Sequence, residues 1–250
     1  MKPFVIIAAV FLSSVFALSC EGEQSTEASD DSVVYPILLE YDRFRFSLYK
    51  DVSAAQAVEL YDSLNANADR IMNHLRVPTM PQVNVSIWAR AHSNDYYAHM
   101  QTLIGQVYPG ANGYTPDYRS MCLLWDSTIP KGSVHEYAHL VSIALKRNIS
   151  NNPRWLWEAI AQYESGMYSH ASLWPPSERV FPGFGALNQF NSELPYRWGY
   201  YLVACIIEHW GEDAYINLLK ANGNIETVLG VTESEFGGIV NTYILSLLPS

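Results

Sequence analysis

The order of hydrophobic and polar residues divides the chain into a strand-rich first half and a helical second half. Residues 33–49 are rich in β-branched and aromatic side chains and then alternate between apolar and polar, as strands do. Residues 83–88 alternate in the same way. Residues 119–125 form a third apolar stretch, directly after the turn-rich residues 109–117. We therefore expect three strand regions before the helical half.

Helical spacing first occurs between these strands and then dominates. Ser53 is a suitable N-cap for a helix whose apolar positions recur every three or four residues, at Ala57, Leu60, Leu64, Ala68, Ile71 and Leu75. Residues 96–104 are typical of a shorter helix, and residues 174–185 form a Pro- and Gly-rich loop. Four further helices are expected, over residues 133–146, 154–166, 197–210 and 213–222. Strands followed by helices predict the α+β fold class.

The composition indicates one globular domain. The chain has 250 residues, 49% of them hydrophobic, and no internal repeats, so it can bury one sizeable core. We expect this domain to be monomeric and to cover residues 33–250, with the sheet in residues 33–147 and a helical half in residues 148–250. The formal net charge of -10, from 25 acidic and 15 basic side chains, argues against a nucleic-acid partner, which needs a basic surface.

The N-terminus predicts export. Residues 1–19 are an apolar run behind a single early Lys2, which is typical of a signal peptide and too short for a spanning helix. The run ends in FALSC, which resembles a bacterial lipobox, so we expect a lipid on Cys20 to anchor the protein in the cell envelope, at the outer membrane or cell surface. The alternative is cleavage after Ala17 and a secreted protein. Residues 20–32 are acidic and lack aromatic side chains, which predicts a flexible tether.

Two further cysteines leave a choice open. In an exported chain, Cys122 and Cys205 can pair as a disulfide. Both lie in apolar surroundings, however, and two buried thiols are an equal alternative.

A possible metal site lies at the start of the helical half. His135 and His139 are four residues apart, so a helix places both imidazoles on one face, with Glu136 beside them. A catalytic zinc needs three protein ligands and one open position for water. Glu158, after eighteen intervening residues, supplies the third ligand if a second helix returns to the first. Structural, hydrogen-bonded histidines are the alternative, but three unpaired polar groups are costly to bury among the apolar neighbours of these residues.

This arrangement resembles the gluzincin metallopeptidases, the thermolysin-like and peptidase MA-like group. In that group, H-E-x-x-H is followed at this spacing by a glutamate within W-x-x-E-[GA]-x-A-x-[YF], which Trp155, Glu158, Ala161 and Tyr163 match. The resemblance implies a zincin-like fold with an active-site cleft between the two halves. It also implies Zn²⁺ bound by His135, His139 and Glu158, and hydrolysis of peptide or protein substrates with Glu136 as the general base.

The resemblance extends less specifically to both sides of the zinc motif. Residues 119–125 correspond to the edge strand that pairs with an extended substrate in this superfamily. Residues 194–211 resemble its aromatic-led helix, which makes Tyr196 the expected hydrogen-bond donor to the oxyanion. Tyr200, one turn later, is the second choice, and a packing role for both tyrosines is the alternative.

The chain also departs from the family pattern. Gln162 stands where thermolysin-type enzymes carry an aspartate that orients a ligand histidine. The G-x-M-E-N signature of the gluzincin aminopeptidases is absent, which favours an endopeptidase. A catalytically silent zinc-binding lipoprotein is the competing hypothesis, and Glu136 argues against it, because a structural zinc site does not need that carboxylate.

The remaining histidines carry less information. Four of them lack partners at ligand spacing and are expected to be surface or capping groups: His74, His92, His99 and His170. We expect His209, near a helix C-terminus, to interact with the terminal carbonyl groups.

Overall fold

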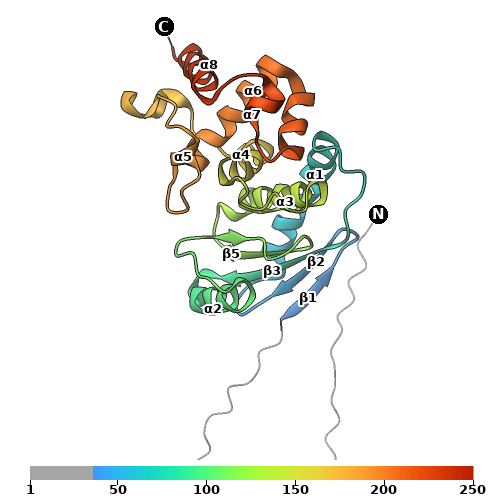
Figure 1. Cartoon of the computed structure of the whole chain (residues 1–250). Helices are drawn as coiled ribbons and strands as arrows, with labels where there is room; N and C mark the ends of the chain where they lie inside the picture. The colour runs from blue at the N-terminus through green and yellow to red at the C-terminus, as the bar shows by residue number, and fades with distance from the viewer. Residues whose placement is uncertain (1–35, 250) are drawn as a thin grey trace, which may run out of the picture.

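The chain has an α+β fold, as the sequence predicted. The computed structural model describes residues 36–249, so residues 1–19, Cys20 and the expected tether, residues 20–32, lie outside the described residues. A five-stranded mixed sheet comes from the N-terminal part, and most helices follow it (Figure 1). The strands are β1 (Ile37–Glu40), β2 (Phe44–Leu48), β3 (Val83–Ala89), β4 (Gly113–Tyr114) and β5 (Ser120–Trp125), in the order β1-β2-β3-β5-β4.

The three central strands β2, β3 and β5 run parallel, and the two outer strands pair antiparallel to their neighbours. The alternation expected at the end of residues 33–49 is confirmed: Phe44, Phe46 and Leu48 are buried while the residues between them are not. The first half of that stretch forms β1, which folds back on β2 as a hairpin.

The expectation that residues 119–125 form the edge strand is wrong. β5 has neighbours on both sides, and the edge is β4, whose Gly113 and Tyr114 pair with Leu123 and Cys122. This two-residue strand lies inside the turn-rich residues 109–117 and is too short to produce a recognisable alternation.

Helices cover both faces of the sheet. α1 (Ala54–His74) and α3 (Ile129–Leu145) lie on one face, where they pack with the buried side chains of β2, β3 and β5. α2 (Ser93–Ile104) covers the other face with a smaller cluster that includes Trp88 and Cys122. Ser53 caps α1 as predicted and forms a capping box with Gln56. α3 therefore lies between the sheet and the helices that follow it in the chain (Figure 1).

The helical half contains three helices of 12, 27 and 14 residues and several short elements. They are α4 (Arg154–Ser165), α5 (Phe184–Leu187), α6 (Leu194–Lys220), α7 (Ile225–Leu229) and α8 (Glu233–Ser246), with 3₁₀ turns η2 (Ala171–Leu173) and η3 (Pro176–Glu178). α6 breaks at Gly211, whose φ of 84° lies outside the helical region, so the two helices expected over residues 197–210 and 213–222 are its two arms. The hydrophobic pattern of the sequence does not predict α7 and α8.

Two further features of the described residues are the state of the cysteines and the absence of a membrane-spanning helix. Cys122 and Cys205 are both buried and free, which decides between the two alternatives for these residues in favour of unpaired thiols. Among residues 36–249, no helix combines the length and the apolar character needed to span a bilayer.

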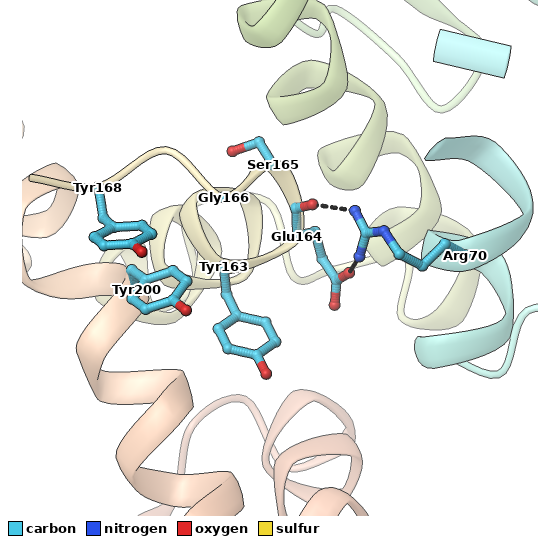
Figure 2. Close-up of a pocket in the computed structure, with 7 residues that line it drawn as sticks. All are labelled: Arg70, Tyr163, Glu164, Ser165, Gly166, Tyr168 and Tyr200. Carbon is cyan, nitrogen blue, oxygen red and sulfur yellow. Dashed lines mark hydrogen bonds and ion pairs between the residues drawn. The ribbon is translucent and has the colours of Figure 1, made fainter. Parts of the chain in front are cut away.

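A buried carboxylate at the end of α4 joins α1 to the helical half. The Glu164 side chain is completely buried, and Arg70 donates to its Oε2 at 2.9 Å and also to its main-chain oxygen (Figure 2). His74 Nδ1 lies 2.5 Å from Oε1, and the Tyr215 hydroxyl donates to the same oxygen at 3.4 Å. His74 is therefore not the surface or capping group expected from the sequence, because the carboxylate that pairs with it comes from a distant helix.

This pairing makes stability depend on pH. The hydrogen bond to Glu164 raises the pKa of His74, against the opposing effect of burial. A raised pKa in the folded state means that the stabilisation is complete below the unfolded pKa of about 6.5 and is lost as the pH rises through the folded value. We expect His74→Gln to lower the free energy of unfolding by about 1.5 kcal/mol at pH 5.5, typical of a hydrogen bond to a charged group, and by less at pH 9.

Urea unfolding at the two pH values measures this difference. His92→Gln, which removes an exposed histidine paired with Asp51, is the matched control and should have little effect at either pH. An equal loss at both pH values for His74→Gln would contradict the assigned pairing.

Candidate metal centre

The two histidines of the motif lie on a helix that is buried on all sides. Residues 133–142 of α3 are all buried, because the sheet and α1 lie on one side and α4 on the other. His135 and His139 are 7% and 4% exposed, and their rings are perpendicular with centroids 4.7 Å apart. The His139 ring stacks on Trp157 at 3.9 Å, which fixes its plane. Polar side chains on such a helix need partners, and the next helix supplies one.

α4 brings Glu158 to the two imidazoles, as the spacing predicted. Glu158 is 4% exposed, and its Oε2 lies 3.3 Å from His135 Nε2 and 3.6 Å from His139 Nε2. One ligand atom from each residue lies within 4.8 Å of the other two. Atoms bound tetrahedrally at the usual zinc distances would be about 3.4 Å apart, so the donor set fits a single ion.

The unpaired Glu158 Oε2 also fits a metal ligand. Among the described residues, Glu158 Oε2 and the Nδ1 atoms of both histidines are buried without a hydrogen-bond partner. Burial raises the pKa of Glu158, but the contacts with His135 and His139 outweigh it and hold that pKa well below its usual range. Burial also lowers the pKa of His139, whereas at His135 the contacts with Glu158 outweigh the effect of burial and raise the pKa. The three residues therefore form a buried group that can hold a metal ion.

Glu136 faces the sheet edge. Its side chain is 8% exposed, and Thr115 Oγ1 donates to its Oε2 at 2.9 Å. Gly113 of β4 lies against the same carboxylate, since a Cβ atom at that position would be only 2.6 Å from Glu136 Oε1. The absence of a side chain at Gly113 thus lets the carboxylate lie between α3 and the edge strand.

The structure places Tyr196 beside the three candidate ligands. Its hydroxyl donates to Glu158 Oε1 at 3.3 Å, and its ring lies 6.2 Å from the His135 ring. α6 reaches this position because Gly199 packs directly on α4, where a Cβ would be 2.8 Å from the Ala159 Cα. Burial raises the pKa of Tyr196, so its hydroxyl stays protonated and can donate a hydrogen bond.

Tyr200 lies elsewhere. It stacks on Tyr168 at 4.0 Å and lines a pocket near Glu164, at the opposite end of α4 (Figure 2). Six residues of helix separate Glu158 from Glu164, which is about 9 Å along the axis. The structure thus assembles His135, Glu136, His139, Glu158 and Tyr196 in one place and leaves Tyr200 outside it.

Sequence reasoning missed three residues that touch this group. Arg154 Nη1 lies 2.8 Å from Glu158 Oε1, and the four-residue spacing of the pair on one helix could have indicated the contact. Gly113 of β4 and Thr115, directly after that strand, touch Glu136, and no local signal could have placed the strand there. Gln162, in the position of the family's aspartate, is 4% exposed.

The roles predicted for the remaining histidines are only partly confirmed. His170 accepts from the Ser172 amide at the start of η2, and His209 Nδ1 lies 3.0 Å from the Cys205 carbonyl oxygen, so the capping and carbonyl roles expected for them are confirmed. His99 is not a surface group, because its Nδ1 lies 2.7 Å from the Tyr114 hydroxyl and its ring packs near Trp88.

Comparison with known proteins gives no family assignment. The chain matches no protein-family model and no curated protein. Any functional interpretation therefore depends on the residues themselves.

We expect the purified protein to bind one equivalent of a divalent metal ion. His139→Ala removes one of three ligands and should reduce the bound metal to a small fraction of an equivalent after dialysis, because two protein ligands hold an ion much less tightly than three. Elemental analysis measures the metal content. His170→Ala, which removes an exposed capping histidine, is the control and should keep a full equivalent. Unchanged metal content in His139→Ala would rule out this centre.

Proposed function

We propose that the protein is a zinc-dependent peptidase, and in particular an endopeptidase of the gluzincin type. The observation that supports this best is the position of Glu158 Oε2, which faces two imidazole Nε2 atoms at 3.3 and 3.6 Å without a hydrogen bond from any described residue. Two neutral nitrogen ligands and one carboxylate are the donor set of many catalytic zinc sites. Glu136 lies next to this group without belonging to it, as a general base requires.

The residues of the site have distinct roles in the proposed reaction. His135, His139 and Glu158 would hold zinc, which supplies Lewis-acid activation of a water molecule and of the scissile carbonyl. Glu136 accepts a proton from the attacking water and returns it to the leaving amine. The hydrogen bond from Thr115 Oγ1 orients the Glu136 carboxylate and leaves its second oxygen available for that proton.

Tyr196 is proposed to stabilise the negative charge that develops on the carbonyl oxygen. Its hydroxyl donates to Glu158 Oε1 at 3.3 Å, which is long for an O–H donor, so it can turn to a substrate oxygen at little cost. An extended substrate would pair with the open side of β4, the edge of the sheet next to Glu136.

The proposed setting is the cell envelope. A signal peptide over residues 1–19 and a lipid on Cys20 would export and anchor the chain, with residues 20–32 as a tether that lets a monomeric domain reach peptide or protein substrates. This part of the proposal depends on sequence pattern alone.

Glu136→Gln should separate catalysis from metal binding. The substitution keeps the side-chain volume and removes the base, so zinc should remain at one equivalent while hydrolysis falls roughly a hundredfold to ten-thousandfold. Cleavage of a diverse peptide mixture, followed by mass spectrometry with and without chelator, measures the activity. Thr115→Val, which removes only the orienting hydrogen bond, should cause a smaller loss. A wild-type protein that binds zinc but cleaves nothing would instead support the silent zinc-binding lipoprotein.

Tyr196→Phe should lower kcat by about tenfold or more with zinc content and folding unchanged, because only the hydroxyl is lost. The control is Tyr200→Phe, one turn later on the same helix and stacked on Tyr168, which should keep wild-type kcat. If both variants turn over peptide at the wild-type rate, Tyr196 only packs beside the ligands.

A further inference from the structure

The positively charged side chain of Arg154 is buried beside the candidate metal centre. Arg154 is the first residue of α4 and is 8% exposed. Its Nη1 lies 2.8 Å from Glu158 Oε1 and donates to Asn151 Oδ1 at 2.9 Å, and its Nη2 donates to the Tyr196 hydroxyl at 3.0 Å. The guanidinium also lies over the Phe190 ring, 5.1 Å from its centroid. One side chain thus contacts a proposed ligand, a proposed oxyanion donor and the loop before α6.

Arg154 stabilises the buried Glu158 carboxylate, but it would be electrostatically unfavourable beside a bound metal ion. A guanidinium close to a divalent cation repels it, and burial removes the solvent that would screen the repulsion. With a metal ion bound to Glu158, the ion itself would balance the carboxylate charge, and Arg154 would no longer be needed for that purpose. The contacts made by the two Glu158 oxygens show how Arg154 affects the way in which this carboxylate can bind a metal.

The two carboxylate oxygens of Glu158 have different environments. Oε1 forms an ion pair with Arg154 and accepts a hydrogen bond from Tyr196, whereas Oε2 faces the two imidazoles without a hydrogen bond from the described residues. A carboxylate free to rotate can bind a metal through both oxygens and so occupy the position that water needs. With Oε1 already engaged, only Oε2 remains for the ion.

We propose that Arg154 is a positioning residue that restricts Glu158 to binding the metal through one oxygen and so keeps a coordination position open for water. This inference rests on the proposed zinc site. Arg154 also orients the second proposed catalytic group. Because the Tyr196 oxygen accepts a hydrogen bond from Nη2, its hydroxyl hydrogen must point away from Arg154, toward Glu158 Oε1 or a bound substrate.

Cobalt substitution tests the proposal without measuring turnover. Four-coordinate Co²⁺ absorbs visible light more strongly than Co²⁺ with five or six ligands, so absorption intensity reports the coordination number. The Co²⁺-loaded full chain should show the strong band of a four-coordinate site. In Arg154→Met, which keeps the length and loses the charge and hydrogen bonds, Glu158 Oε1 becomes available, and the band should lose intensity at one equivalent of bound cobalt.

A matched variant controls for the loss of a charge pair on the same helix. Arg70→Met breaks the pair with Glu164 at the opposite end of α4 and should reduce stability while leaving the cobalt spectrum unchanged. Arg154→Lys keeps the charge but not the two-pronged contact, so it should give an intermediate intensity and serves if Arg154→Met does not fold.

The outcomes distinguish this inference from the proposed function. A wild-type spectrum in both folded Arg154 variants would overturn the positioning role and leave the zinc peptidase intact. Failure of the wild-type protein to bind cobalt or zinc would overturn the metal centre, and the positioning role with it.

Discussion

The helical half is arranged around the negative charge of Glu158, which the fold buries where water cannot solvate it. An ionised carboxylate in an apolar interior is very costly without partners. The partners come from three segments: the histidines of α3, Arg154 of α4 itself and Tyr196 of α6. Each of these helices must therefore hold its position for the carboxylate to remain charged.

α4 carries a second buried carboxylate, and the comparison shows what is particular about Glu158. Glu164 has both side-chain oxygens engaged, by Arg70 on one and by His74 and Tyr215 on the other. Glu158 has one oxygen engaged and one that only faces imidazoles. A fully satisfied buried carboxylate links helices, whereas a half-satisfied one is a place where a ligand can be accommodated. The same helix thus carries a structural carboxylate at one end and a candidate ligand at the other.

The sequence predicted the features that depend on local spacing. The helical pair of histidines, the returning Glu158 and the Ser53 cap follow from periodicities along one or two helices, and the structure has each of them. It did not predict β4 or the pairing of His74 with Glu164, because these contacts join segments distant in the chain and leave no periodic trace. Tyr196 was identified by resemblance. Its distance from Glu158 depends on how closely α6 approaches α4 at Gly199, and that distance cannot be predicted from a single sequence.

The close contact between α4 and α6 at Gly199 makes the position of Tyr196 sensitive to heating. The two histidines lie on the innermost helix, between the sheet and the helical half, whereas Tyr196 lies on α6, which packs on α4 at Gly199 too closely to accept one methyl group, and among the described residues its hydroxyl bonds only to those of α4. Expansion of the α4–α6 contact by a fraction of an ångström would withdraw the hydroxyl while both imidazoles stay in place. If the protein is the zinc peptidase proposed above, this movement would remove activity on heating before the ion is released.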